Sequence, residues 1–326
     1  MMKMRQPTSQ KKVAIIGECM IELSGKPFEQ QMQSYGGDTL NTAVYLSRLC
    51  SGLTPYYVTG LGCDSYSQNM RTMWQQEGID TSLVLTTEGK LPGLYAIQID
   101  DFGERSFHYW RNDSAARYLC EHNGFFAVVE QLKTMDLIYL SGISLAILPD
   151  EGKAALLHAL ASLKQHNVKI AVDSNYRPRL WPNASEARKW LDLLYQLSDI
   201  ALVTAEDEDL LLEQDNTPPE LIADRLHRLG IDQVVVKLGA DGAMWSCHQQ
   251  RGVVAGQKVD QVVDTTAAGD SFNGAYLAAW CHGMSMAESC HWGNALAAQV
   301  IQCKGAIVPT NQINHITTAM SEVNEN

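Results

Sequence analysis

The sequence Asp264-Thr-Thr-Ala-Ala-Gly-Asp-Ser-Phe-Asn-Gly-Ala275 predicts a junction that runs from a strand through a loop into a helix. It follows the apolar pair Val262-Val263 and continues into an apolar helical pattern. The first amides of a helix lack intrahelical partners, and the helix dipole adds partial positive charge at that end. The small side chains of Ala267, Ala268 and Gly269 leave such amides open to an anion.

Asp270 lies at the mouth of this predicted anion site. A carboxylate there would repel a bound phosphate, so we expect it to take a proton from a hydroxyl group that attacks phosphorus. The alternative is that Asp270 only caps the helix, a position that Asp favours. The spacing alone leaves both interpretations open.

Length and composition exclude several classes of protein. The 326 residues, 45% of them apolar, suffice for one large α/β domain or two small ones. The net charge of −12 argues against binding to nucleic acid or to an anionic membrane surface. Eight cysteines without a Cys-x-x-Cys motif indicate reduced thiols in a cytoplasmic protein, and no apolar run is long enough for a membrane span.

Strand and helix patterns alternate over much of the chain, which predicts a parallel sheet whose strands end at one shared site. The predicted strands are 13–17, 56–62, 136–141, 168–173, 200–204 and 233–237. The predicted helices are 42–50, 65–77, 151–166, 186–197 and 221–229. No Pro- or Gly-rich linker divides the chain, so we expect one domain.

The residues 93–100 and 105–111 alternate between apolar and polar, which predicts a hairpin around Asp101-Phe-Gly103. A period of two puts Phe107, Tyr109 and Arg111 on one face. Aromatic residues with an arginine are unusual on a ribbon that only meets solvent. The alternative is a packing face at a sheet edge.

Two further motifs carry polar groups that suit a small ligand. In Gly36-Gly-Asp-Thr-Leu-Asn41 the glycines permit close approach of the backbone, and Asn41 offers a donor and an acceptor to a hydroxyl group. In Asn175-Tyr-Arg-Pro-Arg-Leu-Trp181, Arg177 can present a planar fork to a carboxylate or phosphate. The alternatives are a turn with a helix cap and an ordinary surface arginine.

Together, these motifs resemble the PfkB, or ribokinase-like, family of carbohydrate kinases, from about Val13 to Pro309. The resemblance implies a ribokinase-like three-layer α/β/α sandwich with a mostly parallel central sheet. It also implies a kinase domain at 13–315 with inserted segments at about 18–35 and 93–112 that form a small β-sheet lid. The family string Gly-Ala-Gly-Asp has Ala267 in place of its first glycine here.

The resemblance also implies roles for individual residues. Asp270 would be the catalytic base, and Ala267, Ala268 and Gly269 the anion hole. The implied substrate-binding residues are Gly36, Gly37, Asp38, Asn41, Tyr95, Tyr109, Arg111, Arg177 and Asp270. The implied ATP-binding residues are Asn175, Arg177, Lys237, Gly239, Gly242, Ala267, Ala268 and Gly269. Lys237 equally suits packing at the edge of the core.

For the metal, the resemblance implies Mg²⁺, which Glu208 would contact through water. The asparagine that the family usually has three residues earlier is Ala205 here, and acidic residues that match the helix dipole are a strong alternative. A monovalent cation near Ala306 is left open. The pairs Cys281-His282 and Cys290-His291 do not have the spacing of a zinc site.

The motifs around Tyr95, Tyr109, Arg111 and Arg177 resemble the branch of the family that phosphorylates 2-keto-3-deoxy-D-gluconate at its C6 hydroxyl with ATP. A charge-assisted hydrogen bond contributes about 1.5–3 kcal/mol, so two arginines favour a sugar acid over a neutral hexose. A fructokinase or other sugar kinase of the same family is the nearer alternative, and a non-catalytic sugar-acid sensor the farther one. The resemblance further implies a homo-oligomer formed through the lid.

Overall fold

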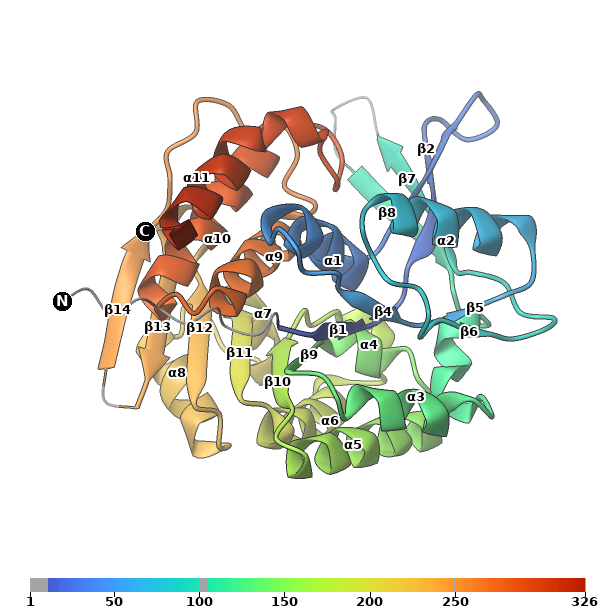
Figure 1. Cartoon of the computed structure of the whole chain (residues 1–326), viewed down its shortest axis with the longest axis horizontal. Helices are drawn as coiled ribbons and strands as arrows, with labels where there is room; N and C mark the ends of the chain where they lie inside the picture. The colour runs from blue at the N-terminus through green and yellow to red at the C-terminus, as the bar shows by residue number, and fades with distance from the viewer. Residues whose placement is uncertain (1–10, 100–104, 249, 326) are drawn as a thin grey trace.

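The computed structural model describes residues 11–99, 105–248 and 250–325. Its central sheet has the order β14-β13-β12-β11-β10-β9-β1-β4 (Figure 1). The strands are β1 (Val13–Ile16), β4 (Tyr56–Val58), β9 (Leu137–Ser141), β10 (Lys169–Asp173), β11 (Ile200–Thr204), β12 (Gln233–Lys237), β13 (Gly242–Cys247) and β14 (Gln250–Ala255). The strands from β4 to β12 are parallel, and β13 and β14 form an antiparallel edge. The predicted mostly parallel sheet is confirmed.

The sheet is buried between two helical layers, because its strands are apolar on both faces. Along β1, Val13 and Ile15 pack into one core cluster, and Ala14 and Ile16 into the other. The first layer contains α1 (Asp38–Leu49), α2 (Ser65–Gln76), α9 (Ala268–Cys281), α10 (Met286–Val300) and α11 (Asn314–Glu325). The second contains α3 (Phe125–Leu132), α4 (Gly142–Ala146), α5 (Asp150–Gln165), α6 (Ala184–Leu197), α7 (Ala205–Leu212) and α8 (Pro219–Arg228). The three-layer α/β/α sandwich is confirmed.

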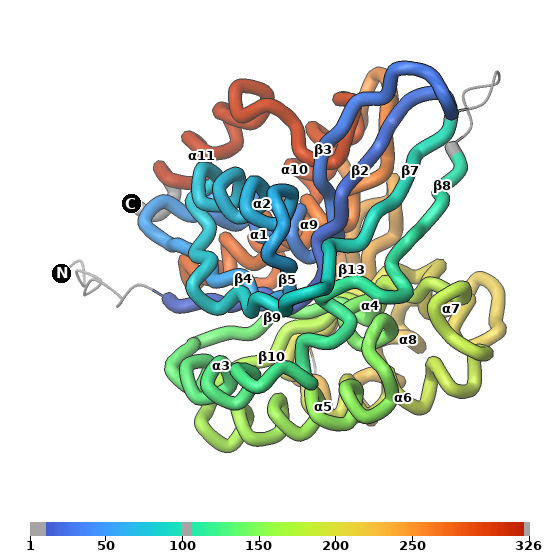
Figure 2. Tube along the Cα trace, turned by 90° about the vertical axis from the view of Figure 1, so that its right-hand side faces the viewer, coloured from blue at the N-terminus to red at the C-terminus, as the bar shows by residue number. Residues whose placement is uncertain are grey.

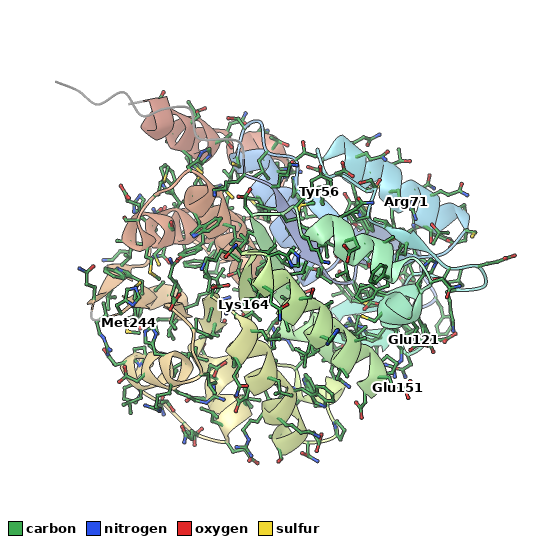
Figure 3. All side chains as sticks on the ribbon, turned by 60° about the horizontal axis from the view of Figure 1, so that its bottom comes forward. Tyr56, Arg71, Glu121, Glu151, Lys164 and Met244 are labelled. Carbon is green, nitrogen blue, oxygen red and sulfur yellow. The ribbon has the colours of Figure 1, made fainter. Side chains whose placement is uncertain are left out.

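The second layer shows how local sequence fixes a helix. Figure 3 looks onto this layer, where Glu151 and Lys164 lie towards opposite ends of α5. An acidic residue in the first turn and a basic residue in the last turn both interact favourably with the helix dipole and stabilise the helix ends. The helix α5 therefore begins and ends close to the predicted positions.

The order of the strands reverses at β1. The chain leaves β1 for β4 on one side and later returns to β9 on the other side. Ligands in open parallel sheets bind outside the carboxyl ends of the strands at such a reversal. Ser141 and Lys237 end β9 and β12 at this edge, and Glu18 and Asn175 follow β1 and β10 by two residues.

A second sheet has the order β3-β2-β7-β8 and is called the lid below. Its strands are β2 (Met20–Ser24), β3 (Met32–Gly36), β7 (Leu94–Ile99) and β8 (Arg105–Trp110). Figure 2 shows the lid rising from one side of the molecule. The antiparallel pairing of β7 with β8 confirms the predicted hairpin, whose turn at 101–103 lies outside the described residues.

One predicted strand is wrong. The run 56–62 divides into β4 and a separate β5 (Gly60–Leu61), which pairs with β6 (Leu85–Thr86) in a small sheet of its own. A Cβ atom on Gly60 would lie 2.4 Å from the Ala115 carbonyl oxygen. The chain therefore turns out of the central sheet where only a glycine fits.

The helices α1 and α9 lie side by side at very short range. A Cβ atom on Gly274 would lie 2.7 Å from Cβ of Tyr45 and 3.0 Å from the Thr42 carbonyl oxygen. The Thr42 hydroxyl donates to the carbonyl of Asp270 at 3.2 Å. This contact sets the first turns of both helices against each other.

Candidate active site

The helix α9 begins at Ala268 with Ala267 as its N-cap, and no side chain caps it. Asp270 lies in the first turn rather than at the cap, so the alternative that it is an N-cap is wrong. The Ala268 amide donates to the Thr265 carbonyl at 3.2 Å, and no side chain caps the amides that follow it. Amides at a helix start, next to small side chains, suit a phosphate oxygen. This is the local geometry that the sequence predicts for the anion site.

The Asp270 carboxylate accepts a hydrogen bond from Asn41 Nδ2 at 2.8 Å. Burial and, to a smaller extent, the negative charge of Asp38 raise the pKa of Asp270 to about 8, although the Asn41 hydrogen bond opposes the shift. A carboxylate with such a pKa binds a proton readily near neutral pH, as a general base must. The structure thus brings together Asp270, Asn41 and Asp38, which the sequence predicts to form one site.

Asp38 ties the glycine motif to the carboxyl ends of two central strands. Its carboxylate accepts from Ser141 Oγ at 2.5 Å and from Asn175 Nδ2 at 2.7 Å. Asn175 has a left-handed φ of 35°, a conformation that asparagine tolerates better than most residues. Asn175, predicted to contact ATP, therefore lies directly beside a predicted sugar-binding residue.

Lys237 is buried beside the start of α9. Its ammonium donates to Asp173 at 2.7 Å and to Asn273 at 3.3 Å. A Cβ atom on Gly269 would lie 3.4 Å from Lys237 Nζ, so the positive charge is adjacent to the predicted anion site. The packing and phosphate-binding interpretations of Lys237 are compatible. The side chain is buried against Asp173 and Asn273, and its ammonium still lies close to the start of α9, where a phosphate would bind.

Sequence reasoning missed Asp173 and Asn273 as parts of this site. Asn273 Nδ2 donates to Asp173 at 2.7 Å and to the Tyr139 hydroxyl at 3.0 Å. An available signal was that Asp173 ends a buried apolar strand, and that Asn273 follows Asp270 by three residues on the same helix. Both side chains hold Lys237 in place.

Several glycines that the sequence predicts to bind substrate or ATP make room for protein atoms. A Cβ atom on Gly36 would lie 2.3 Å from the Tyr95 hydroxyl, and one on Gly37 would lie 2.2 Å from the Glu18 carbonyl oxygen. Gly242 has a φ of 99°, and a Cβ atom on it would lie 2.2 Å from the Val254 carbonyl oxygen. Gly239 has a φ of 58°, and a Cβ atom there would meet no other atom within 4 Å. Gly37 and Gly242 are therefore required by close packing against the backbone, whereas Gly36 makes room for the end of the Tyr95 side chain.

The two lid tyrosines share one face. Tyr95 and Tyr109 pair across β7 and β8 with ring centroids 5.9 Å apart, and the Tyr95 hydroxyl donates to Glu22. Burial raises the pKa of Tyr109, and the positive charges of Arg111 and Arg177 lower it. The predicted aromatic and basic residues thus lie within electrostatic reach of one another.

Both predicted arginines already have protein carboxylates as partners. Arg111 forms an ion pair with Glu18, and both side chains are buried. Arg177 donates to Asp207 at 3.0 Å and to the Tyr176 carbonyl at 2.8 Å, and about half of its side chain (52%) is exposed. These partners could not be predicted from sequence patterns, because they lie 93 and 30 residues away along the chain.

Glu208 lies in the core rather than on the surface of the site. Its side chain is fully buried, accepts from the Tyr195 hydroxyl at 2.5 Å and contacts Arg225 Nη1 at 3.1 Å. Burial raises its pKa to about 7. Burial raises the pKa of Asp207, on the same helix, and the positive charge of Arg177 opposes this shift. The predicted water-mediated contact of Glu208 with a metal stays a prediction.

Other candidate sites in the described part of the chain are less complete. No group of three His, Cys, Asp or Glu side chains there has the arrangement of a metal site, and the eight cysteines are free thiols. Within the same residues, no helix is long and apolar enough to cross a membrane.

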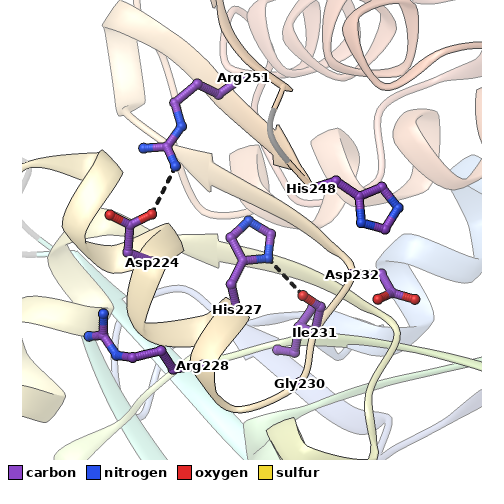
Figure 4. Close-up of a pocket in the computed structure, with 8 residues that line it drawn as sticks. All are labelled: Asp224, His227, Arg228, Gly230, Ile231, Asp232, His248 and Arg251. Atoms are coloured by element: carbon purple, nitrogen blue, oxygen red, sulfur yellow. Dashed lines mark hydrogen bonds and ion pairs between the residues drawn. The ribbon is translucent and has the colours of Figure 1, made fainter.

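A pocket of about 480 Å³ lies at the amino end of β12, opposite the end that carries Lys237 (Figure 4). Its Arg251 pairs with Asp224 at 2.8 Å, and its His227 bonds to the Ile231 carbonyl at 2.8 Å. These polar groups already have protein partners, so the pocket adds nothing to the site at the start of α9.

Comparisons with known proteins agree with this geometry. The sequence model of the pfkB family of carbohydrate kinases matches residues 10–313. A 2-dehydro-3-deoxygluconokinase of Haemophilus influenzae is 48% identical over 94% of this chain and 98% of its own length. The enzyme of the same name from Escherichia coli K12 is 45% identical over 92% and 97%. A solved Escherichia coli protein described as a ribokinase II, in complex with ATP and Mg²⁺, has a TM-score of 0.80 at 22% identity, covering 95% of this chain and 99% of its own.

Proposed function

The chain belongs to the pfkB family of carbohydrate kinases, and we propose that it transfers the γ-phosphate of ATP to the C6 hydroxyl of 2-keto-3-deoxy-D-gluconate. The observation that carries the proposal is Asp270 in the first turn of an uncapped helix, held by Asn41. The relatives that share the proposed activity by name cover nearly the whole chain. The product would be 2-keto-3-deoxy-6-phosphogluconate.

In this mechanism Asp270 takes the proton of the C6 hydroxyl as the oxygen attacks phosphorus. Asn41 orients the carboxylate, and the amides of Ala268 to Asp270 with Lys237 stabilise charge on the phosphate oxygens. Mg²⁺, when bound, would neutralise charge on the β- and γ-phosphates of ATP. The uncapped amides and the Lys237 ammonium are the donor types that suit ATP, and the carboxylates of Asp173 and Asp207 suit a hydrated Mg²⁺.

The sugar acid would lie between the glycine motif and the lid. Gly36, Gly37 and Asn41 would face its hydroxyl groups, and Tyr95 and Tyr109 would cover it. Arg177 and Arg111 would hold the carboxylate and its neighbours. Arg177 is the more available of the two, because it is half-exposed and has one carboxylate partner.

A fructokinase is the second candidate, since it shares the fold and the base. The two arginines favour the acid, because a neutral hexose has no group that needs a guanidinium. Release of ADP with 2-keto-3-deoxygluconate, fructose and ribose, measured side by side, separates the candidates. We expect the sugar acid to be preferred by at least about tenfold in kcat/KM, which corresponds to one charge-assisted bond. Preference for fructose, or no ADP release with any of them, contradicts the proposal.

The variant Asp270→Asn tests the role of the base. We expect it to bind the sugar acid and ATP but to lose about 10²–10⁴-fold in kcat, because the amide cannot accept the proton. Isothermal titration gives the binding and ADP release gives the rate. Near-normal turnover would remove Asp270 from the mechanism.

The proposal extends to the surroundings of the site. The kinase domain would span 13–315 with lid segments at about 18–35 and 93–112, in a cytoplasmic protein whose eight thiols stay reduced. A monovalent cation would bind near Ala306, in a loop where Tyr45 donates to Ala306 O at 2.7 Å and Gly305 N donates to Asp264 at 2.8 Å. Comparing ADP release in potassium and lithium salts tests the cation.

We also propose that two copies pair through the outer face of the lid. This face borders a hollow of about 650 Å³, whose lining combines apolar side chains such as Ile21, Leu23 and Trp110 with polar ones such as Gln33 and Asp113. Trp110 and Leu91 expose 62% and 58% of their surface there. An exposed apolar patch of this kind marks an interaction surface.

A further inference from the structure

Glu18 is a buried carboxylate that the proposed reaction does not use. It lies two residues after the end of β1 and exposes only 3% of its surface. One carboxylate oxygen forms an ion pair with Arg111 Nη2, and the other accepts a hydrogen bond from the Ser114 hydroxyl. A buried carboxylate is costly unless it is paired, so this contact needs both partners.

The ion pair is enclosed by the glycines of the substrate motifs. A Cβ atom on Gly93 would lie 2.9 Å from Glu18 Oε1 and 3.2 Å from Arg111 Cβ. Gly37, in turn, lies against the Glu18 carbonyl oxygen. The same residue therefore contacts the glycine pair through its backbone and the lid arginine through its side chain.

The guanidinium of Arg111 retains hydrogen-bonding capacity. Its Nε is buried and has no hydrogen-bond partner among the described residues. Its Cζ lies 5.9 Å from the centroid of the Tyr109 ring, on the lid face that carries both tyrosines. The ion pair thus holds Arg111 through one nitrogen. The guanidinium is planar and rigid, so this contact also fixes the directions of its other N–H groups.

We propose that Glu18 is a positioning residue and the resident counter-ion of Arg111, and that its charge limits how tightly the acid end of the substrate binds. The inference rests on the proposed function. In the free protein Glu18 neutralises the guanidinium. In the complex, two carboxylates share it, and their mutual repulsion weakens the binding of the substrate. Glu18 would therefore act on an anionic substrate and not on a neutral one.

The variant Glu18→Gln isolates the charge. Glutamine keeps the shape, can accept from Arg111 with its oxygen and can donate to Ser114 with its nitrogen. We expect KM for 2-keto-3-deoxygluconate to fall by roughly three- to tenfold at an unchanged kcat, because the ligand becomes the main counter-ion of Arg111. KM for fructose, measured as a poor neutral substrate, should stay within about twofold.

Thermal unfolding provides a readout that does not depend on turnover. Without ligand, Glu18→Gln should unfold at a lower temperature than the wild type, because Arg111 is then buried without a counter-charge. Saturating 2-keto-3-deoxygluconate, without ATP, should raise the midpoint of the variant by more than that of the wild type. Ser114→Ala is the matched control, since it removes the other bond of Glu18 and leaves the charge. It should not change the preference for the acid.

The outcomes separate the two proposals. If the wild type prefers the sugar acid but Glu18→Gln raises KM for acid and fructose alike, or leaves both unchanged, the counter-ion proposal is wrong. If the wild type does not use the sugar acid, the proposed function fails on its own.

The double variant Glu18→Gln/Arg111→Met tests the ion pair even in that case, because removal of both charges should restore the unfolding midpoint lost in Glu18→Gln. No recovery in the double variant would show that the pair is not a charge pair.

Discussion

At the scale of single residues, the site depends on how a carboxylate is made basic. Asp270 is surrounded by protein, with Asp38 nearby and one amide donor, Asn41. Loss of water and a like charge both disfavour the ionised form, and one hydrogen bond only partly compensates. The sequence could predict Asp270 as the candidate base, together with its neighbours, because these residues lie in short motifs. It could not predict that Asp38 would be close enough to change the base, since this depends on how α1 meets α9.

The raised pKa predicts the pH dependence of catalysis. With a pKa of about 8 in the free protein, kcat/KM for the sugar acid should rise with pH and reach half of its maximum near pH 8. Asp38→Asn should move this midpoint to lower pH, because it removes the like charge. Initial rates of ADP release across pH 5 to 9.5 give both profiles. A rate that is already constant from pH 5 upwards, as the ordinary aspartate pKa of about 4 would give, would contradict the assignment.

The same shift makes a prediction for stability. A pKa that is higher in the folded than in the unfolded protein favours folding while the group is protonated in both states. That contribution is complete below about pH 4 and is lost as pH rises towards about 8. The wild type should therefore lose stability relative to Asp270→Asn between pH 4 and 8, as urea midpoints at each pH would show. A constant difference between the two proteins would mean that Asp270 titrates normally.

At the scale of elements, the contact between α1 and α9 fixes the geometry of the site. The helices meet at Gly274, which lies one turn after Asp270 and against Tyr45, one turn after Asn41. The sequence predicted both helices, but the apolar pattern could not show that they touch through backbone. It also missed the separate β5, because Gly60 leaves the sheet to meet Ala115, a residue distant along the chain.

Gly274→Ala tests this contact. The added methyl group would have to displace Tyr45, which should cost about 1–3 kcal/mol of unfolding free energy. Displacement of Tyr45 would shift α1 and separate Asn41 from Asp270. We therefore expect a larger fall in kcat than change in KM. Gly283→Ala, whose site has open space but a φ of 74°, is a control that disturbs the backbone away from the contact. Loss of stability with unchanged kcat would show that the helix contact does not position the base.

At the scale of the whole molecule, the central sheet was the most predictable feature. Buried parallel strands such as β1 and β12 are short apolar runs that can be recognised in the sequence. The antiparallel edge of β13 and β14 and the joining of β2 with β7 were not predicted, because they depend on pairing between distant segments. The ion pairs of Arg111 and Arg177 were missed for the same reason.

The outer face of the lid carries a prediction about assembly. Trp110→Lys should shift the protein towards a monomer, because it places a charge in the apolar patch. Sedimentation velocity over a range of protein concentrations measures this. Phe126→Lys is the control, since Phe126 is also exposed, at 74%, but lies on α3 in the second helical layer. Equal sedimentation of the wild type and Trp110→Lys would place any interface elsewhere.

The bond between Asn41 and Asp270 spans 229 residues of chain, and this has a consequence during translation. A ribosome adds about 5–20 residues per second, so on the order of ten seconds or more separates the emergence of the two partners. Until Asp270 emerges, α1 lacks the helix against which Thr42 and Tyr45 pack. The candidate site therefore cannot assemble before α9 has been synthesised.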